Sequence, residues 1–562
     1  MRSCLERIFY FYPKSVLMIK KILFLILCFG MFLGCDDAGK EEADLLVVNA
    51  NIYTVNEEFS TAEAFVVKDG KFLAVGTSAE MQEKYKASEV VDAQGKTILP
   101  GLIDAHAHFY GLGSTMQAVN LTGTTSFEEV VARITEFQQE KNSDFIVGRG
   151  WDQNDWEVQE FPVKDTLDLL FPDTPVAITR IDGHALLANQ AALDAANISV
   201  DTPAEGGEIE KKDGKLTGIL IDNPMALVEN AVPVASVKDQ TEALLDAQKE
   251  VFQYGLTTVN DAGLNRATIE LIDSLQQAGE LDVRIYAMIS NTKENLDYYL
   301  DREPLKTPRL NVRSVKFYAD GALGSRGAAL KEPYSDKRNH YGALLSSVAD
   351  FKKTAGRIAN SAYQMNTHAI GDSANVVVLK TYDSLLSNAG DRRWKVEHSQ
   401  IIAPEDFKYF SKNIIPSVQP THATSDMYWA GERLGEEREK GAYAYKKLLE
   451  EAGIIALGTD FPVEQVSPFL TFYAAVARKD TKNYPEGGYM PQQALSREEA
   501  LRGMTIWAAY SNFEEEEKGS IEPGKYADFV ILDRDIMKVS EEQIPDMKAS
   551  ATYLNGKKVY GN

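Results

Sequence analysis

Residues 97–108 read Thr97-Ile98-Leu99-Pro100-Gly101-Leu102-Ile103-Asp104-Ala105-His106-Ala107-His108. The apolar character of this run predicts a buried strand over Thr97–Asp104, followed at once by two histidines. Side chains at positions i and i+2 of an extended segment point to the same side, so the imidazoles of His106 and His108 can reach one metal ion.

Seven further apolar runs of strand-like length follow and alternate with helical stretches. Such alternation predicts parallel βα units, and eight units close a barrel. The predicted fold class is therefore α/β, a (β/α)8 TIM barrel over residues 98–505. The later strands are predicted at Gly255–Asp261, Arg284–Ile289, Val312–Ala319, Gln364–Ala369, Trp394–Glu397, Ile414–Gln419 and Ile454–Gly458.

The interval between the first two predicted strands, about residues 109–250, is too long for one βα connection. It contains strand-like runs of its own at Phe145–Gly148 and Pro175–Ile181. An insertion after the first strand is the simplest interpretation.

Short apolar or alternating runs return at both ends of the chain. Asp69-Gly70 and Asn555-Gly556 each stand between such runs, which is typical of a hairpin turn. The shared character of residues 36–97 and 506–562 predicts one small β-sandwich domain built from both termini.

The composition is that of a globular protein, with 562 residues of which 44% are hydrophobic and 25% charged. The formal charge is 59 minus 83, or −24, and the acidic residues are spread along the chain. This balance disfavours nucleic acid and an anionic lipid surface as partners. We expect a small-molecule substrate, and the sequence leaves open whether the chain forms a homo-oligomer.

Residues 1–35 are typical of a signal peptide. Lys20 and Lys21 precede the apolar run Ile22–Leu33, and Gly34 then precedes Cys35. The junction resembles a bacterial lipobox, which implies lipidation of Cys35. We therefore expect a lipid anchor that holds the protein at a membrane of the cell envelope, outside the cytoplasm, on the periplasmic or outer-surface side.

Two alternatives for this leader stay open. Val16–Leu33 is long enough to act as an uncleaved membrane helix, and Met18 is a second candidate for the true start. All three cysteines lie in the leader, so a metal bound further along the chain must use nitrogen and oxygen ligands.

Four more polar residues stand at or near the ends of predicted strands. His368, His398 and Asp460 follow three of the runs, and Lys316 lies within the fourth predicted strand. The C-terminal ends of barrel strands form the face where active sites are built. A lone strand-end histidine is often only a hydrogen-bonded structural residue, and a strand lysine often reaches to solvent. The joint occurrence of these residues favours a metal site.

The sequence resembles the amidohydrolase superfamily and, within it, amidohydrolase family 3, the YtcJ-like branch that includes N-substituted formamide deformylases. The resemblance covers nearly all of the chain after the leader, and this ordered set of motifs is highly specific. The matching segments are Pro100–His108, Gly148–Asp152, Asp182–His184, Lys316 with Asp320-Gly321, Thr367–Asp372, Val396–His398, Ser417–Pro420, Gly458–Asp460 and Gly519–Asp528.

The resemblance implies a divalent metal centre with one or two ions. The implied ligands are His106, His108 and Asp460 for one ion and His368 and His398 for the second. Lys316, carboxylated by carbon dioxide, would bridge them, because a carbamate supplies anionic oxygens where an ammonium would repel the cations. Zinc is the expected metal, although manganese, iron or cobalt would suit the same ligands.

By the same resemblance, Asp460 accepts a proton from the attacking water and returns it to the leaving nitrogen. His184 or His422 would stabilise charge on the carbonyl oxygen. Packing or capping is an equally good interpretation for most of the residues expected to contact substrate. These residues are Trp151, Asp152, Arg326, Gln419 and His422.

The function that we expect is hydrolysis of a carbon–nitrogen bond in an amide, N-formyl or N-acyl compound other than an ordinary peptide. A single-metal deaminase is one alternative, and it would leave Lys316 unmodified. An inactive surface lipoprotein that only binds a ligand is another, but it would have no need to retain the histidines and Asp460.

Overall fold

The computed structural model describes residues 39–181, 183, 185–204, 207–222, 224–324 and 326–561. The predicted signal peptide, the lipidation site Cys35 and the candidate catalytic residue His184 lie outside these residues. Within the described ranges, no helix combines the length and the apolar character needed to cross a membrane.

Eight parallel strands form the central sheet, as the sequence predicts. A short strand, β17 (Leu305–Lys306), adds only an antiparallel pairing to the first half of one interior strand, at Asn311 and Val312. In spatial order the eight are β22 (Ala456–Leu457), β21 (Ile414–Val418), β20 (Trp394–His398), β19 (Gln364–Ala369), β18 (Leu310–Tyr318), β16 (Arg284–Ser290), β15 (Leu256–Leu264) and β8 (Leu102–Ala107). The predicted (β/α)8 fold class is confirmed.

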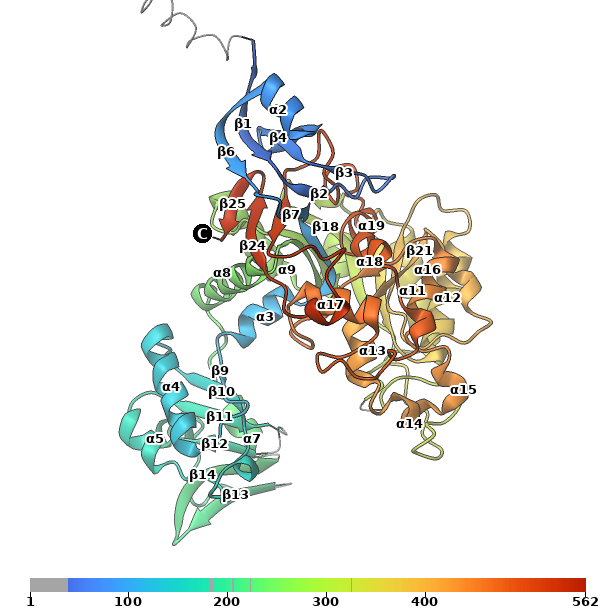
Figure 1. The fold of residues 1–562 in the computed structure, drawn as a ribbon. Helices are drawn as coiled ribbons and strands as arrows, with labels where there is room; N and C mark the ends of the chain where they lie inside the picture. Colours follow the sequence, from blue (N-terminus) through green and yellow to red (C-terminus); the bar gives the residue numbers. More distant parts are fainter. Residues whose placement is uncertain are drawn as a thin grey trace, which may run out of the picture.

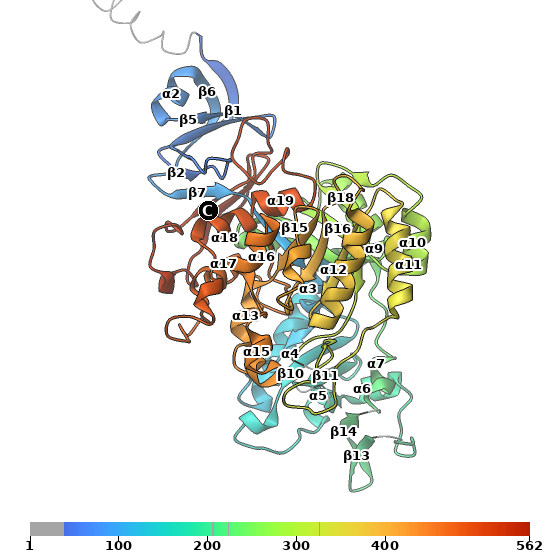
Figure 2. The same ribbon diagram turned by 90° about the vertical axis from the view of Figure 1, so that its right-hand side faces the viewer.

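Helices surround this sheet (Figures 1 and 2). Most bury one apolar face, as in α9, where Ile269, Ile272 and Leu275 recur at helical spacing and are all buried. The surrounding helices are α8 (Val237–Gln253), α9 (Arg266–Ala278), α10 (Lys293–Tyr299), α11 (Val348–Ala359), α12 (Asp372–Leu386), α16 (Tyr445–Ala452), α17 (Pro468–Ala477), α18 (Arg497–Gly503) and α19 (Ile506–Ser511).

The barrel closes between β8 and the segment that follows β22. The Asp460 backbone N–H donates to the His106 carbonyl over 2.8 Å. The Asp104 carboxylate accepts hydrogen bonds from the Thr459 backbone N–H at 3.1 Å and from its hydroxyl at 2.7 Å. Only glycine fits at position 458, since a Cβ there would lie 2.5 Å from the His106 nitrogen. This closure sets His106 and Asp460 side by side.

Two sheets built from both ends of the chain lie at the end of the barrel where its strands begin (Figure 1). One has the order β5-β4-β1-β6 and the other β25-β24-β23-β7-β2-β3. Their strands are β1 (Glu41–Val48), β2 (Asn51–Tyr53), β3 (Thr61–Ala62), β4 (Ala64–Lys68), β5 (Lys71–Gly76), β6 (Tyr85–Asp92), β7 (Thr97–Pro100), β23 (Phe529–Leu532), β24 (Ala549–Leu554) and β25 (Lys557–Tyr560), with helix α2 (Ser78–Lys84) between β5 and β6. The prediction that both termini share one β structure is confirmed.

Both predicted hairpin turns are present. Asp69 and Gly70 join β4 to β5 with φ angles of 51° and 75°, and Asn555 and Gly556 join β24 to β25 with 51° and 73°. Positive φ at two successive residues is the conformation for which Asp-Gly and Asn-Gly are favoured.

The prediction of a single first strand over Thr97–Asp104 is wrong. Its first half is β7, which pairs with β2 and β23 in the terminal sheet, and the barrel strand β8 begins only after Gly101. Glycine permits this change of sheet, because a Cβ at position 101 would lie 2.2 Å from the Thr257 hydroxyl oxygen. One apolar run thus contributes to two sheets.

The interval after β8 contains a separate lobe, which lies below the barrel in both ribbon views (Figures 1 and 2). The two strand-like runs predicted there are confirmed as β10 and β11. Helices α3 (Phe109–Thr115) and α8 pack against each other beside the barrel. The lobe contains the sheet β13-β14-β12-β11-β10-β9 and four helices: β9 (Val119–Asn120), α4 (Phe127–Lys141), β10 (Ile146–Trp151), α5 (Asp165–Leu170), β11 (Val176–Arg180), β12 (Ala185–Ala188), α6 (Gln190–Ala195), β13 (Gly207–Lys212), β14 (Lys215–Asp222) and α7 (Met225–Glu229).

Replacing Gly458 by alanine tests how closely the barrel ends approach. The added methyl group meets backbone that has no room to move, so we expect the free energy of unfolding to fall by about 1–3 kcal/mol, measured by urea denaturation. Gly356→Ala is the matched control, because a Cβ there has no described neighbour within 4 Å beyond its own helix, α11. That variant should be neutral or more stable by up to about 1 kcal/mol. Equal stability of the two variants would contradict the close approach.

Candidate metal centre

All six predicted ligand residues line one cavity of about 390 Å³ at the C-terminal ends of the barrel strands. The ends of parallel strands meet at one face, which brings residues from distant parts of the sequence together. The six are His106 in β8, His108 just after it, Lys316 in β18, His368 in β19, His398 at the end of β20 and Asp460 after β22.

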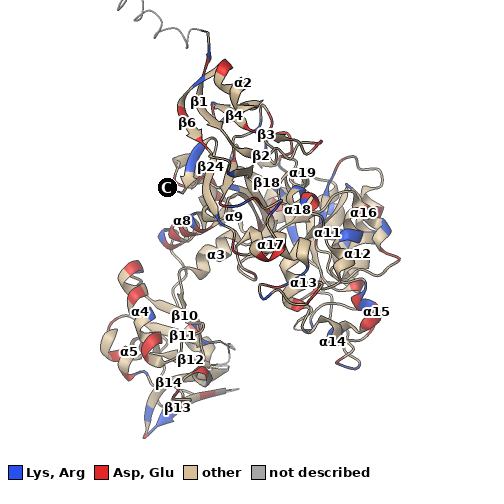
Figure 3. Ribbon diagram, viewed as in Figure 1, with Lys and Arg blue, Asp and Glu red and all other residues tan. Residues whose placement is uncertain are grey.

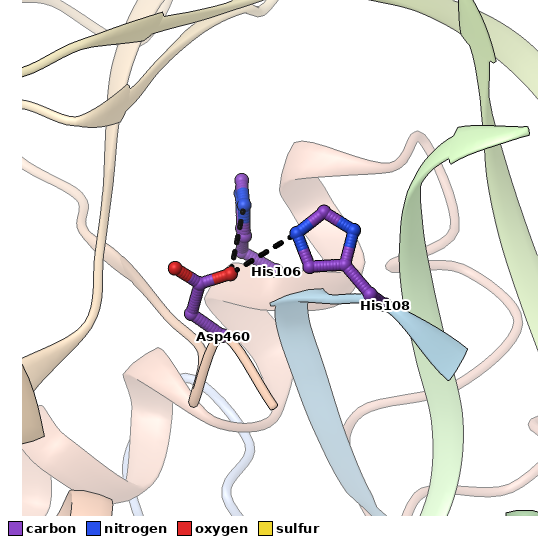
Figure 4. Close-up of side chains that lie close together, drawn as sticks. All are labelled: His106, His108 and Asp460. Carbon is purple, nitrogen blue, oxygen red and sulfur yellow. Dashed lines mark ion pairs between the residues drawn. The ribbon is translucent and has the colours of Figure 1, made fainter. Parts of the chain in front are cut away.

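His106, His108 and Asp460 point toward one another (Figure 4). Asp460 Oδ1 lies 3.2 Å from His108 Nε2 and 3.6 Å from His106 Nε2. One ligand atom from each residue lies within 4.8 Å of the other two, a spacing that three ligands of one ion can adopt. His106 and Asp460 are buried, whereas 29% of the His108 side chain is exposed, so the group is open on the side of His108.

Glu397 fixes the orientation of His106. Its Oε2 lies 2.6 Å from His106 Nδ1, and both side chains are almost fully buried. Burial alone would raise the pKa of Glu397, but the contact with His106 and two nearby lysines lower it. An ionised carboxylate accepts the Nδ1 proton, which leaves the Nε2 lone pair of His106 directed at the site.

Lys316 Nζ lies 3.0 Å from this same Nε2 atom of His106. The side chain is buried, and burial lowers the pKa of Lys316 against the opposing effect of Glu397 and Asp460. A lysine that is readily neutral has the lone pair needed to react with carbon dioxide.

His368 and His398 lie beside the first group. Their ring centroids are 4.4 Å apart, and that of His398 is 5.0 Å from His106. His368 Nε2 and His398 Nδ1 are buried without a hydrogen-bond partner among the residues that the structure describes. Burial lowers the pKa of His368 to about 3 and that of His398 well below its ordinary value. Both imidazoles are therefore neutral, as metal ligands must be.

The backbone at two of these positions is strained. His398 and Asp460 have φ angles of 69° and 64°, in the left-handed region that residues other than glycine seldom adopt. Such conformations cost roughly 1–3 kcal/mol each and concentrate at functional sites.

His422 contacts Asp460 from the opposite side. Its Nε2 lies 3.1 Å from Asp460 Oδ2 and its Nδ1 lies 3.3 Å from Glu464 Oε1. Burial alone would lower the pKa of His422, but the two carboxylates raise it to about 10. His398, His422 and Asp460 also meet the spacing of a three-ligand set. The structure thus offers two sets of ligands that share Asp460.

This collection of side chains fits a divalent ion. It offers buried imidazole and carboxylate donors. The imidazoles of the ligand candidates are neutral and the carboxylate is anionic, as metal binding requires, and some of their donor atoms have no hydrogen-bond partner among the described residues. Nitrogen and oxygen ligands of this kind suit zinc and also manganese, iron or cobalt.

The structure does not bring the other predicted substrate residues to the cavity. Trp151 is fully buried in the core of the lobe, where its Nε1 donates to the Ile178 carbonyl, and Asp152 pairs with Arg180 in the same lobe. A large indole stabilises the core of this small lobe by burial, which explains why the motif position serves packing.

Arg326 and Gln419 also lie away from the cavity lining. Arg326 forms two hydrogen bonds to Asp336, so its guanidinium is already neutralised. Gln419 is buried at the start of α13 (Pro420–Asp426), where its Nε2 donates to the Ser417 carbonyl at 3.3 Å. Of the predicted substrate residues, His422 is the one that lines the cavity.

Four residues of the site had no role assigned from the sequence. Glu397 stands next to a predicted ligand, and Asp426 lies one helical turn after His422. Their spacing from predicted site residues could therefore have identified both as candidates. Glu464 follows Asp460 by four residues, in a segment without a predicted element. Asp320, whose Oδ1 lies 3.8 Å from His368 Nε2, accepts hydrogen bonds from three backbone N–H groups of neighbouring loops.

Three curated relatives are similar over nearly the whole chain. "Protein LONG AFTER FAR-RED 3" of Arabidopsis thaliana is 34% identical over 542 residues, 92% of each chain. "Putative amidohydrolase YtcJ" of Bacillus subtilis (strain 168) is 32% identical over 521 residues, 91% of this chain and 98% of the relative. "N-substituted formamide deformylase" of Arthrobacter pascens is 27% identical over 544 residues, 91% of this chain and 97% of the relative.

A crystal structure of an uncharacterized metal-dependent hydrolase from Pyrococcus furiosus has the same fold, with a TM-score of 0.74 and 27% identity. The alignment covers 88% of this chain and 100% of that one. The model of the "Amidohydrolase family" matches residues 89–560, which include every described ligand candidate. The chain is a metal-dependent hydrolase that belongs to the amidohydrolase family.

Proposed function

We propose that the protein hydrolyses a carbon–nitrogen bond in a small amide, N-formyl or N-acyl compound other than an ordinary peptide. The observation that carries the proposal is the convergence of His106, His108 and Asp460 beside the buried Lys316. The similarity to a protein named for deformylation of N-substituted formamides supports this bond type.

The centre would hold one or two divalent ions, with zinc as the expected metal. His106, His108 and Asp460 would hold one ion and His368 and His398 the second, with the modified Lys316 shared between the two. A bound ion would lower the pKa of a water molecule from ~15.7 towards ~7 and would polarise the substrate carbonyl.

Lys316 is proposed to carry a carbamate. The neutral Nζ would form a bond to the carbon of carbon dioxide, one carbon–oxygen π bond would become a carboxylate, and the nitrogen would release a proton. The product is anionic, which suits a side chain that lies 3.0 Å from a candidate ligand nitrogen.

Asp460 is the residue that we propose moves the proton. His422 donates to its Oδ2, which orients the carboxylate, while Oδ1 faces His106 and His108. Asp460 would accept a proton as the water oxygen bonds to the carbonyl carbon, and would return it to the nitrogen as the carbon–nitrogen bond breaks. The products are a carboxylic acid and an amine. His184, outside the described residues, stays a proposed donor to the carbonyl oxygen.

A single-metal deaminase is the second candidate. It is supported by the three-residue set of His106, His108 and Asp460, which could hold one ion without Lys316. In that case Lys316 would remain an unmodified amine.

Metal analysis and turnover test the proposed function. Protein purified with bicarbonate should contain about two metal ions per chain, release amine from a panel of N-formyl and N-acyl compounds, and show a labile mass increase equal to one carbon dioxide. Asp460→Asn should lower kcat by about 10²–10⁴. One metal with unmodified lysine would move the assignment to the single-metal enzyme. Bound metal without turnover on the whole panel would contradict amide hydrolysis.

Glu397→Gln tests whether Glu397 orients His106. The amide can still accept the Nδ1 proton but lacks the charge, so we expect metal affinity, measured by chelator competition, to fall about 10–100-fold. Glu498→Gln is the matched control, since Glu498 pairs with Arg502 on the surface of α18. An unchanged metal affinity in Glu397→Gln would show that the charge of Glu397 does not orient His106 for metal binding.

We also propose that the protein acts outside the cytoplasm, held at a membrane of the cell envelope by lipid on Cys35, with a small molecule rather than nucleic acid as its partner. The support is the lysine pair, apolar run and Gly34-Cys35 junction of the leader. Cells fed labelled fatty acid should incorporate it into the protein, and Cys35→Ser should abolish the label. Equal labelling of both proteins would exclude this anchor.

A further inference from the structure

The cavity above the candidate ligands has mostly apolar and aromatic walls. Leu323, Ile370, Trp429 and Val463 contribute apolar surface. Trp429 precedes α14 (Ala430–Leu434) and is partly buried, while 69% of Val463 is exposed at the mouth. Walls of this kind suit an aliphatic or aromatic chain.

The charged groups of this lining are unbalanced. Apart from the six candidate ligands, the lining residues with a charged or imidazole side chain are His422 and two carboxylates, Asp426 and Glu464. Among the described residues that line it there is no arginine, and Lys316 is the single lysine. Arg433 stacks on Trp429, but its guanidinium pairs with Asp336 outside the cavity. His422 contacts Asp460 and Glu464 through its two ring nitrogens, so no cationic side chain without a partner is available among these described lining residues to bind an anionic substrate group.

Glu464 already has partners. Its Oε1 accepts a hydrogen bond from the Ser425 hydroxyl at 2.6 Å and lies 3.3 Å from His422 Nδ1. This carboxylate serves to hold His422 in contact with Asp460.

Asp426 is held differently. Its Oδ2 accepts from the hydroxyl of the buried Tyr443 at 2.8 Å and lies 3.4 Å from Gln400 Nε2. Both donors are uncharged, so they orient the carboxylate without neutralising it. Its Oδ1 has no hydrogen-bond partner among the residues that the structure describes, and the residue lines the cavity.

The position of Asp426 relative to the reacting groups follows from helix geometry. His422 and Asp426 lie four residues apart in α13, and therefore on one face of the helix, about 6 Å apart along its axis. His422 contacts Asp460. A group bound by Asp426 would therefore lie a few bonds from a carbonyl held beside Asp460.

We propose that the substrate carries a cationic group, a protonated primary amine or a guanidinium, and that Asp426 binds this group. The proposal rests on the proposed amide hydrolysis and names the substrate class for it. The formal charge of −24, with acidic side chains on the barrel, the lobe and the terminal sheets (Figure 3), favours approach of a cation.

Matched substrates test this assignment on the metal-loaded full-length protein. N-formylputrescine ends in an ammonium group, N-formylpentylamine replaces that group by a methyl, and N-formyl-γ-aminobutyrate ends in a carboxylate. We expect kcat/KM to be higher for the cation than for the neutral compound by about 10–100-fold, because a charge-assisted hydrogen bond is worth that factor. Asp426→Asn, which keeps an acceptor for Tyr443, should remove this preference.

Asp480→Asn is the control variant, because it removes the same charge outside the cavity lining, where Asp480 bonds to the Tyr428 hydroxyl. It should keep the preference for the cation. Equal or better turnover of the neutral or anionic compound by the wild type would overturn the cation assignment and leave amide hydrolysis intact. If no compound is hydrolysed, calorimetric binding of N-formylputrescine but not N-formylpentylamine, lost in Asp426→Asn, would support the cation site while refuting hydrolysis. Equal binding of both compounds would overturn the cation site.

Discussion

The contact between the first and last strands of the barrel is the constraint on which the site depends. Asp104 accepts two hydrogen bonds from Thr459, and Gly458 approaches β8 so closely that no side chain fits between them. Because this contact fixes the register of the two ends, Asp460 lies beside His106 and His108. A barrel that closed one residue out of register would turn Asp460 away from the histidines.

This closure also explains why strained conformations persist at the ligand positions. Left-handed φ angles at His398 and Asp460 cost roughly 1–3 kcal/mol each, and they persist only where the surroundings leave no alternative. Contacts at the opposite end of the barrel add to the rigidity that this closure provides. Arg284, at the start of β16, forms a buried pair with Asp528 of the C-terminal segment at 2.6 Å. Losing one partner of such a pair costs about 3–5 kcal/mol, so the terminal sheets brace the end of the barrel that carries no chemistry.

The sequence predicts most of this fold because the barrel strands are short apolar runs that end in polar residues. It fails where one run serves two structures, as at Gly101, since a continuous apolar pattern does not show where the chain leaves one sheet for another. The ligand candidates were predictable because strand ends converge on one face. The locations of Trp151 and Arg326 were not predictable. Whether a motif residue packs in a core, forms an ion pair or faces a cavity depends on neighbours elsewhere in the sequence, such as Ile178, whose carbonyl accepts from the Trp151 indole.

Beyond the ligand candidates, the described residues that line the cavity belong mostly to elements other than those that the motifs suggested. The lobe after the first strand uses its aromatic residues for its own core, whereas the described cavity wall comes from the segments that follow β18, β19, β20 and β22, from α13 and from the residue that precedes α14. On α13, His422 contacts the carboxylate proposed to move the proton, and Asp426 stands one turn further along. One helix face thus joins the reacting groups to the wall of the pocket. On the proposed binding of a cation by Asp426, a substitution at position 426 would change the charge that the pocket selects, while β8, β20 and the Asp460 segment would keep the ligands in place. Changes of this kind let one barrel serve several substrates.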